Sequence, residues 1–474
     1  MSNTAQVSAS KRIEALLDDN SFVEIGGLVT ARNTDFNLGD NATPADGVIT
    51  GYGVINGSLV YVYSQDATVL GGAIGEMHAK KIAKIYDMAM KVGAPVVGLI
   101  DCAGLRLQEA TDALNAFGEV YLKQTLASGV IPQITAIFGT CGGGAALIPT
   151  LTDFTFMTAE GGKLFVNSPN ALDGNYQAKL DTASAAYLSE NSSLVDGVFE
   201  DDATTLANIR SLVDMLPDNN MEDAESDCTD DLNRIIPNLD GFAKDARAVL
   251  QNIADNNVFV EVKKDYAKDM VLGLIKLNGA TVGCVANQAA DGGELLSTSG
   301  AYIAADFVKF CDAFNIPVLT LVNAKGFVAT VSNERTIADA AAKLTYAFAD
   351  ATVPKVTVVM GDAFGTAYTI MNSKAIGADM VYAWPCAKIG TMDPEMAVKI
   401  MYEKEIAEAA DKVAFIAEKK KAYTELQSSA LAAAKRGYID DIIEPDATRK
   451  RVIAAFDMLS TKNEERPYKK HGAV

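Results

Sequence analysis

Short apolar runs alternate along the chain with segments whose apolar residues recur at helical spacing. Residues 78–92 are the clearest helical case, with an apolar face made of Ile82, Ile85, Tyr86 and Ala89. The opposite face carries the polar side chains of Lys84, Asp87 and Lys91. This pattern predicts an amphipathic helix. Apolar runs that end at a glycine and lead into such helices predict an α/β fold with largely parallel strands.

One apolar stretch is long enough to raise the question of a membrane span. Residues 124–152 carry no charged side chain, and a helix of this length would cross the hydrocarbon core of a bilayer, which is about 30 Å thick. Pro132, Pro149 and the run Gly142–Gly144 would interrupt such a helix. We therefore interpret residues 130–138 as a buried strand of a parallel sheet.

The first half of the chain recurs in the second half. Three pairs of segments match at one offset of 222 residues: 56–60 with 278–282, 93–104 with 315–326, and 131–146 with 353–368. Prolines and glycines stay in register, since Pro95 aligns with Pro317 and Gly139 with Gly361. A fixed offset over three segments indicates a tandem duplication.

Matches at other offsets show where the two copies differ in length. Phe22 matches Phe259, which places a longer loop in the first copy, in the polar stretch 32–46. Glu200 matches Glu444, so the offset grows from 222 to 244 and the second copy gains 22 residues. The acidic, asparagine-rich segment 218–231 is the expected linker. We expect one domain over residues 1–230 and a second over residues 231–474.

Composition and charge exclude several classes of function. The chain has 61 acidic and 41 basic residues, a net charge of −20 and a pI near 4.6, which disfavours binding to nucleic acid. Its six cysteines and two histidines are scattered, so we expect neither a metal site nor a disulfide framework. No secretory signal is recognisable at the N-terminus, from which we expect a cytoplasmic location.

A glycine-rich cluster follows the repeated strand in each half. It reads GTCGGGAA at residues 139–146 and GDAFGTAY at residues 361–368. Glycine lets a ligand oxygen approach main-chain N–H groups, and a helix that begins there adds the positive end of its dipole. One such cluster alone would favour a tight strand–helix turn. Two clusters at equivalent positions favour two oxyanion-binding sites.

Other reaction types fit the sequence less well. Neither cluster matches the dinucleotide pattern GxGxxG or the phosphate-loop pattern GxxxxGKS/T, so nucleotide hydrolysis is disfavoured. A Ser-His-Asp hydrolase would have to use His78, because His471 lies in the tail. We interpret His78 as a residue at the start of a helix. Acid–base catalysis by paired carboxylates stays open, since no spacing singles out a pair.

Motifs along nearly the whole chain resemble the carboxyltransferase subunits of biotin-dependent acyl-CoA carboxylases and decarboxylases, of the propionyl-CoA carboxylase beta and methylmalonyl-CoA decarboxylase alpha type. In the first half they are TVLGGAIGEMH at 68–78, KVGAPV at 91–96, ASGVIPQI at 127–134 and LTDFTFM at 151–157. In the second half they are FCDAFNIP at 310–317, ATVPKVT at 351–357, YAWP at 382–385 and RGYIDDIIEP at 436–445. The resemblance implies two tandem crotonase-like domains of the ClpP/crotonase superfamily, an active site at a dimer interface, and a homo-oligomer, usually a hexamer.

The resemblance also implies a reaction. The chain would move a carboxyl group between carboxybiotin and the α-carbon of a short acyl-CoA, with propionyl- or methylmalonyl-CoA ahead of acetyl-, malonyl- or glutaconyl-CoA. Biotin would arrive on a separate biotin carboxyl carrier protein, and the other partner would be a biotin carboxylase or a membrane decarboxylase subunit. The alternatives are a crotonase-type hydratase or hydrolase that needs no biotin, and an inactive scaffold subunit.

By motif position, the resemblance assigns the catalytic groups to main-chain amides. Gly143 and Gly144 would hold the thioester oxygen of the acyl-CoA, and Thr366 and Ala367 the ureido oxygen of biotin. The further substrate-binding positions are Gly71, Gly72, Gly104, Gly142, Ala145, Gly326, Phe327, Gly365 and Thr369. No catalytic histidine is required, because biotin itself would take the α-proton.

Some positions depart from the family pattern. The chain reads NAKGFVAT at residues 323–330, where most members read DVPGFLPG. Thr366 replaces a usual glycine, and Thr369 stands where propionyl-type enzymes commonly carry aspartate. Lys80, Lys81 and Lys84 would either reach the phosphates of CoA or form a solvated polar face. Residues 89–92 are similar to the biotin attachment sequence AMKM, but Lys91 would close an amphipathic helix, so we expect no biotin there.

Overall fold

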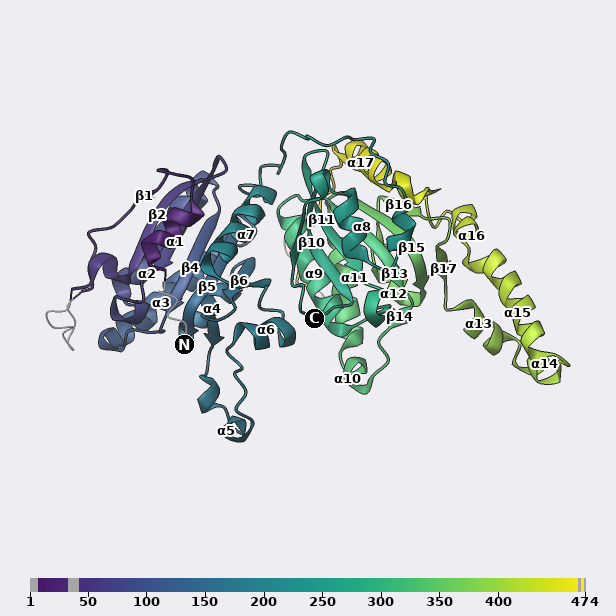
Figure 1. The fold of residues 1–474 in the computed structure, drawn as a ribbon, viewed down its shortest axis with the longest axis horizontal. Helices are drawn as coiled ribbons and strands as arrows, with labels where there is room; N and C mark the ends of the chain where they lie inside the picture. Colours follow the sequence, from purple (N-terminus) through teal and green to yellow (C-terminus); the bar gives the residue numbers. More distant parts are fainter. Residues whose placement is uncertain (1–6, 33–41, 468–469, 473–474) are drawn as a thin grey trace. The chain divides into compact units, whose positions relative to one another are not determined.

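The computed structural model describes residues 7–32, 42–467 and 470–472 (Figure 1). It divides the chain into two units, Met1–Ala224 and Glu225–Val474. Each unit is an α/β fold around its own eight-stranded sheet. The longer loop that the sequence places at residues 32–46 lies mostly outside the described residues, of which 42–46 form the approach to the second strand.

The first unit is built on a mixed sheet in the order β1-β2-β3-β4-β5-β6-β8, with β7 beside β5. Its strands are β1 Val23–Glu24, β2 Val48–Ile55, β3 Ser58–Gln65, β4 Val96–Cys102, β5 Gln133–Gly142, β6 Phe154–Thr158, β7 Lys163–Phe165 and β8 Gly197–Phe199. Strands β1 to β3 pair antiparallel, and all later pairings are parallel. The β2–β3 hairpin turns at Asn56 and Gly57, both with positive φ, as a two-residue turn between twisted strands requires.

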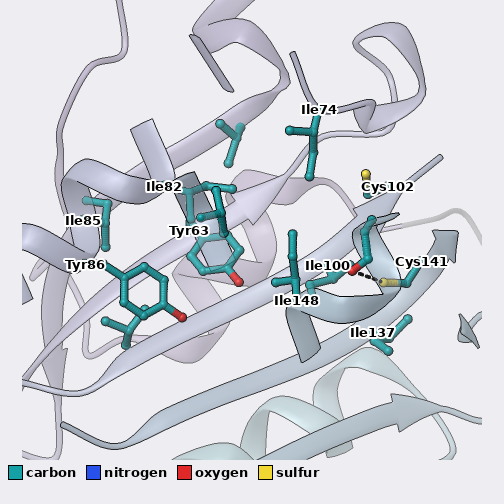
Figure 2. Close-up of a cluster of buried hydrophobic side chains, with 14 of the residues drawn as sticks. Tyr63, Ile74, Ile82, Ile85, Tyr86, Ile100, Cys102, Ile137, Cys141 and Ile148 are labelled. Atoms are coloured by element: carbon teal, nitrogen blue, oxygen red, sulfur yellow. Dashed lines mark hydrogen bonds between the residues drawn. The ribbon is translucent and has the colours of Figure 1, made fainter. Parts of the chain in front are cut away.

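Helices and short 3-10 turns connect these strands. They are α1 Ala9–Leu16, α2 Glu76–Val92, α3 Ala110–Ala127, α4 Leu147–Thr150, α5 Asn175–Ala178, α6 Ala185–Asn191 and α7 Asp202–Met215, with 3-10 turns η1 Pro44–Gly47, η2 Leu70–Gly72, η3 Leu107–Glu109, η4 Gly143–Ala146 and η5 Pro169–Ala171. Helix α2 confirms the predicted amphipathic helix, because its apolar face is buried while Lys84 and Lys91 are exposed. Figure 2 shows part of this core, where Tyr63 and Tyr86 lie beside isoleucines from α2 and the sheet.

The uncharged stretch 124–152 is not one helix. It comprises the end of α3, strand β5, the turn η4 and the short helix α4. In the described part of the chain, no helix is both long enough and apolar enough to cross a membrane. The predicted strand at residues 130–138 is confirmed as β5, which begins at Gln133 and extends to Gly142.

The second unit repeats the first, strand for strand. Its order is β9-β10-β11-β13-β15-β16-β18, with β17 beside β15. The strands are β9 Phe259–Val262, β10 Met270–Leu277, β11 Ala280–Asn287, β13 Val318–Ala324, β15 Lys355–Phe364, β16 Met380–Ala383, β17 Lys388–Gly390 and β18 Asp441–Ile442, and a separate pair joins β12 Leu295–Leu296 to β14 Gly326–Phe327. Even the irregularities recur, because the register shifts after Ile100 in one sheet and after Val322 in the other. The predicted tandem duplication is confirmed.

The extra residues of the second copy form helices. The helical segments of this unit are α8 Ala246–Ile253, α9 Thr298–Ala313, α10 Val331–Glu334, α11 Ile337–Asp350, α12 Gly365–Ile370, α13 Pro394–Met401, α14 Glu403–Glu408, α15 Lys412–Tyr423, α16 Ala430–Lys435 and α17 Thr448–Leu459, with shorter turns at η6 Leu239–Phe242, η7 Asp255–Asn257, η8 Ala290–Gly292, η9 Lys374–Ile376, η10 Thr424–Ser428 and η11 Pro445–Ala447. An isolated β-bridge joins Lys163 to Ser184 in the first unit, and the equivalent β-bridge joins Lys388 to Ser429 in the second. The segment between the bridged residues is 20 residues longer in the second unit. Helices α13 to α15 occupy that insertion.

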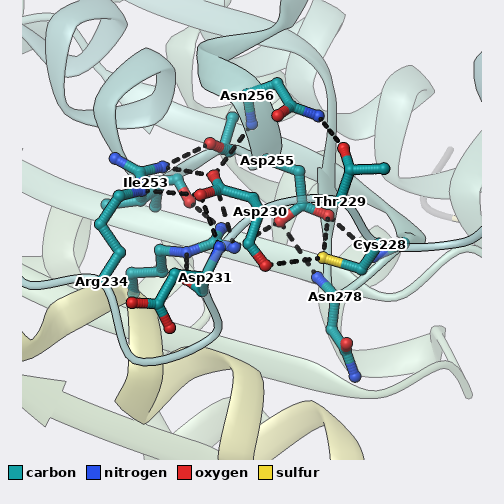
Figure 3. Close-up of polar contacts among 12 residues, drawn as sticks. Cys228, Thr229, Asp230, Asp231, Arg234, Ile253, Asp255, Asn256 and Asn278 are labelled. Carbon is teal, nitrogen blue, oxygen red and sulfur yellow. Dashed lines mark hydrogen bonds and ion pairs between the residues drawn. The ribbon is translucent and has the colours of Figure 1, made fainter.

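A cluster of polar contacts holds the start of the second unit in place (Figure 3). The Arg449 side chain is fully buried and donates to the Ile253 carbonyl at 2.6 Å and to the Asp255 carboxylate at 2.6 Å. Arg234 pairs with Asp230 at 2.8 Å. Because these contacts hold residues on both sides of the predicted domain boundary at 230 and 231, this stretch folds with the second unit.

We expect Arg449→Met to destabilise the second unit by about 3–5 kcal/mol, because it leaves the buried Asp255 carboxylate without its cation. Urea unfolding monitored by circular dichroism measures this change. The matched control is Arg451→Met on the same helix, whose partner Asp441 is half exposed, so that the expected loss is below about 1 kcal/mol. Equal losses in the two variants would contradict the account.

The carboxyl group of Asp153 is expected to make the free energy of unfolding depend on pH. Its carboxylate is part-buried and accepts from the Gln133 N–H at 2.8 Å, and burial raises its pKa from 3.8 to about 7. Between these two pKa values the folded chain keeps a proton that the unfolded chain releases. The contribution of this proton to the free energy of unfolding is therefore fully present below about pH 4 and is lost as the pH rises through about 7. Asp153→Asn keeps the acceptor and removes the titration. We expect it to raise the thermal midpoint at pH 8 and to change it much less at pH 4.5; a gain of equal size at both pH values would contradict the assignment.

Candidate active site

The first glycine cluster forms a sharp junction between strand β5 and the turn η4. Gly143, which follows the strand, has φ +62°, a left-handed conformation that favours glycine. A Cβ built on Gly143 would have no atom within 4 Å. The backbone here therefore borders open space, and a ligand can approach it closely.

The amides at this junction are free to bind a ligand oxygen. In a 3-10 turn each N–H bonds the carbonyl three residues earlier, so the N–H groups of Gly143 and Gly144, the first two residues of η4, have no partner within the turn. In the described structure no side chain caps this turn. These two main-chain donors lie at the positive end of a helical segment that continues into α4, and such a position stabilises negative charge.

Tyr121, which the sequence did not single out, fixes the peptide unit between Gly144 and Ala145. Its hydroxyl donates to the Gly144 carbonyl at 2.6 Å. Since a peptide unit is planar and trans, holding this carbonyl sets the direction of the Ala145 N–H on the opposite side. The thiol of Cys141 makes a similar contact with the Ala145 carbonyl at 3.3 Å. Nothing in the local pattern around Tyr121 singles it out, because it contacts a residue 23 positions away.

The structure brings four of the other predicted positions together beside this junction. The Gly104 carbonyl accepts from the Ile74 N–H at 2.9 Å, and the Gly71 carbonyl accepts from the Ala103 N–H at 3.0 Å. A Cβ on Gly104, which has φ +112°, would lie 3.0 Å from the Gly142 carbonyl oxygen. A Cβ on Gly72 would lie 2.1 Å from the Asp101 carbonyl oxygen. Close backbone packing therefore requires glycine at both of these sites.

The second glycine cluster has the same geometry. Strand β15 ends at Phe364, Gly365 has φ +63°, and helix α12 begins there without a side-chain cap among the described residues. Thr366 is exposed and lies within the helix, so the residue that replaces the usual glycine keeps its N–H at the helix start. Ala367 is buried behind it. Thr369 contacts the Gly365 carbonyl through its hydroxyl at 3.4 Å.

Charged side chains lie beside residues 323–330 of the second unit, where the sequence departs from the family pattern. Gly326 and Phe327 form β14, with Gly326 at φ +151°. Lys325 pairs with Glu294 at 2.5 Å and lies 4.0 Å from Asp362. The hydrogen bond that Lys325 donates to the Glu294 carboxylate raises the pKa of Lys325, which keeps that side chain cationic near the glycine cluster.

Asn323 supports the same backbone. Its amide oxygen accepts from the Asp362 N–H at 3.1 Å, and its amide nitrogen donates to the Ala243 carbonyl at 2.8 Å. The equivalent residue of the first unit is Asp101, whose side chain lies 3.6 Å from Arg12. The neutral amide therefore replaces an acid that has a nearby cation in the other copy.

The histidine and lysines of α2 have structural surroundings. His78 is the third residue of the helix, as predicted, and is fully buried, with its ring 2.9 Å from the Asp46 carbonyl oxygen. Burial lowers the pKa of His78 to about 3, so the ring is neutral near pH 7. Lys80 pairs with Glu76 at 2.6 Å on the surface. Lys81, contrary to both expectations, is buried and donates to the Ala45 carbonyl at 2.7 Å.

The described residues contain no group of three or more His, Cys, Asp or Glu side chains that could hold a metal ion. The duplication places a strand–helix junction that starts with main-chain N–H groups in each unit. Main-chain N–H groups at a helix start stabilise an oxygen on which negative charge develops.

Comparisons with known proteins show the family of this chain. The carboxyl transferase domain matches residues 4–474. Methylmalonyl-CoA decarboxylase subunit alpha of Propionigenium modestum is 41% identical over 483 residues, which cover 99% of this chain and 93% of that protein. Propionyl-CoA carboxylase beta chain of Roseobacter denitrificans is 42% identical over 481 residues, with 99% and 94% coverage.

A solved structure has the same fold. Transcarboxylase 12S, a hexamer crystallised with hydrolysed methylmalonyl-coenzyme A bound, superimposes with a TM-score of 0.94 at 37% identity. The match covers 98% of this chain and 92% of that one. The crotonase-like fold predicted from the motifs is confirmed by this neighbour.

Proposed function

Because the chain belongs to the carboxyl transferase family, we propose that it moves a carboxyl group between biotin and the α-carbon of a short acyl-CoA. The duplicated glycine junction is the observation that carries this proposal. The reaction has two oxygens that gain negative charge, one on the thioester and one on the ureido ring, and the chain has two equivalent sets of helix-start amides.

We assign one junction to each substrate. In the first unit, the N–H groups of Gly143 and Gly144 hold the thioester oxygen and stabilise the enolate that forms when the α-carbon loses its carboxyl group or proton. In the second unit, the N–H groups of Thr366 and Ala367, next to Gly365, hold the ureido oxygen. Biotin, when bound, supplies the ring nitrogen that carries the carboxyl group and accepts the α-proton, which accounts for a site without a catalytic histidine.

Propionyl-CoA and methylmalonyl-CoA are the substrates we favour. Two kinds of relative at 41–42% identity are named for them, and those relatives cover nearly the whole chain. Thr369, beside Gly365, stands where the sequence resemblance places a residue linked to acyl-chain choice, so acetyl-CoA with malonyl-CoA, or glutaconyl-CoA, is the alternative pair.

The proposed partners follow from the same relatives. Their names describe subunits of a decarboxylase and a carboxylase, and we propose a biotin carboxyl carrier protein as the source of biotin, with a biotin carboxylase or a membrane decarboxylase subunit completing the complex. We propose a homo-hexamer, by analogy with the transcarboxylase 12S hexamer. The cytoplasmic location stays a prediction.

The test uses the purified chain with free biotin. Methylmalonyl-, malonyl- and glutaconyl-CoA are incubated separately, and loss of the carboxyl group is followed by chromatography of the CoA esters. We expect biotin-dependent decarboxylation, fastest with methylmalonyl-CoA. If none of the three CoA esters loses its carboxyl group, the proposal is contradicted. Hydration of crotonyl-CoA without biotin would support the hydratase alternative instead.

A further inference from the structure

A buried ionic network lies beside the first glycine junction, outside the amides that hold substrate. Arg106 is 1% exposed. Its guanidinium contacts the Asp46 carboxylate at 2.5 Å, the Glu109 carboxylate at 2.7 Å and the Ala73 carbonyl at 2.9 Å. One side chain therefore joins the 44–47 turn, the 70–76 segment and the chain that leaves strand β4.

The two acids of this network hold the start of helix α2. Glu109 accepts from the Glu76 N–H at 2.6 Å, and Asp46 accepts from the His78 N–H at 2.7 Å. A Cβ on Gly75 would lie 2.3 Å from the Glu109 carboxylate and 2.5 Å from the Arg106 guanidinium. The network therefore fills the space that the missing side chain of Gly75 leaves.

The network is linked to the amide site through the backbone. Arg106 donates its own N–H to the Ile74 carbonyl at 3.0 Å, and the Ile74 N–H donates to the Gly104 carbonyl at 2.9 Å. Gly104 in turn packs against Gly142, the residue before the junction, where a Cβ would lie 3.0 Å from the carbonyl oxygen. A shift of the 70–76 segment would therefore reach the positions that the acyl-CoA is proposed to contact.

The second unit keeps the same backbone hydrogen bond without the Arg106–Glu109 ion pair. The Val328 N–H donates to the Leu296 carbonyl at 3.0 Å. These residues lie 222 positions after Arg106 and Ile74, so this hydrogen bond repeats the one from the Arg106 N–H to the Ile74 carbonyl. Val331 stands at the Glu109 position and Gly300 at the His78 position. The turn can therefore form without an ionic network, and in that unit Asp269 accepts from the Ser297 N–H at 2.7 Å instead.

Stability does not explain the network. Replacing a buried ion cluster by well-packed neutral groups is often neutral or stabilising. The Nε atom of Arg106 also has no hydrogen-bond partner among the described residues, and an unpaired buried donor is costly. A costly arrangement that is present only in the unit proposed to bind acyl-CoA points to a role in that binding.

We propose that Arg106, with Asp46 and Glu109, is a positioning residue that holds the 70–76 segment in place for the acyl-CoA. The inference rests on the proposed function of the first unit. It predicts that the network matters for binding of the CoA ester and not for binding of biotin, which the other unit is proposed to receive.

The test compares the full chain with a triple variant, Asp46→Asn/Arg106→Met/Glu109→Gln. This variant removes every charge of the network but keeps oxygen acceptors for the N–H groups of His78 and Glu76. Propionyl-CoA binding is titrated by calorimetry, and the KM for free biotin and the thermal midpoint are measured in parallel. We expect affinity for propionyl-CoA to fall about tenfold or more, with the KM for biotin and the thermal midpoint unchanged.

A second variant decides the matter if the triple variant does not fold. Gly75→Ala leaves all charges in place but pushes the Arg106–Glu109 pair apart, and it should weaken propionyl-CoA binding with the same selectivity. Wild-type affinity in the folded variant, or equal losses for both substrates, would overturn the inference. A wild-type chain that binds no CoA ester would overturn the proposed function and the inference together, whereas tight binding without biotin-dependent turnover would overturn the proposed reaction alone.

Discussion

Replacing Gly144 by valine is expected to reduce biotin-dependent decarboxylation of methylmalonyl-CoA by about 100-fold or more, the cost of losing one oxyanion donor. A Cβ at this position lies 3.2 Å from the Tyr121 hydroxyl, so the larger side chain displaces the phenol that orients the Ala145 N–H. It also places methyl groups beside the amides that receive the thioester oxygen. Steady-state rates with free biotin measure the effect.

The matched control for this variant is Gly118→Val. Gly118 lies in α3, is exposed, and has no atom within 4 Å of a built Cβ, so the same substitution there should leave turnover near that of the wild type. Unchanged turnover in Gly144→Val, with the fold retained by circular dichroism, would remove the first junction from the reaction.

Thr366→Pro is expected to cause a similar loss, of about 100-fold or more, through the other substrate. Proline removes the N–H of Thr366 and nothing else from the backbone donors. The first turn of a helix tolerates proline, since that N–H has no partner within the helix, and Gly365 has no Cβ to meet the ring. We expect calorimetry to give a wild-type affinity for propionyl-CoA while the rate with free biotin falls.

Thr366→Ala separates the amide from the side chain. It keeps the N–H and removes the hydroxyl, so its rate should fall far less than that of Thr366→Pro. Equal losses in the alanine and proline variants would show that the side chain, and not the main-chain donor, matters at this position. Weaker binding of propionyl-CoA in Thr366→Pro would contradict the division of substrates between the units.

The duplicated architecture could be predicted from the sequence because backbone constraints repeat with it. Gly143 and Gly365 both take a left-handed conformation at a strand–helix junction, and few residues other than glycine adopt it without strain. Glycine therefore occupies the equivalent position in both halves of the sequence. The amphipathic pattern of α2 was equally readable, because its period reflects one buried face.

The side-chain interactions around the site could not be predicted in the same way. Arg106 and Asp46 are 60 positions apart, and Tyr121 and Gly144 are 23 positions apart, so only the packed fold brings them together. Lys81 shows the same limit. Its position on a helix with exposed lysines indicated solvent or phosphate contact, whereas the turn at 44–48 folds over it and supplies two carbonyl acceptors.

The insertion in the second unit is an intermediate case. The change of offset from 222 to 244 predicts extra residues, but their position and helical form come from the structure, which places α13 to α15 between β17 and Ser429, the residue that bridges to Lys388. An offset between two flanking matches counts the added residues and leaves their location open.

A structure of the full chain with propionyl-CoA and biotin bound together tests the division of labour between the two halves most directly. We expect the thioester oxygen within about 3 Å of the amide nitrogens of Gly143 and Gly144, and the ureido oxygen at the same distance from those of Thr366 and Ala367. Ligands that exchange these places, or that bind away from both strand–helix junctions, would contradict this expectation.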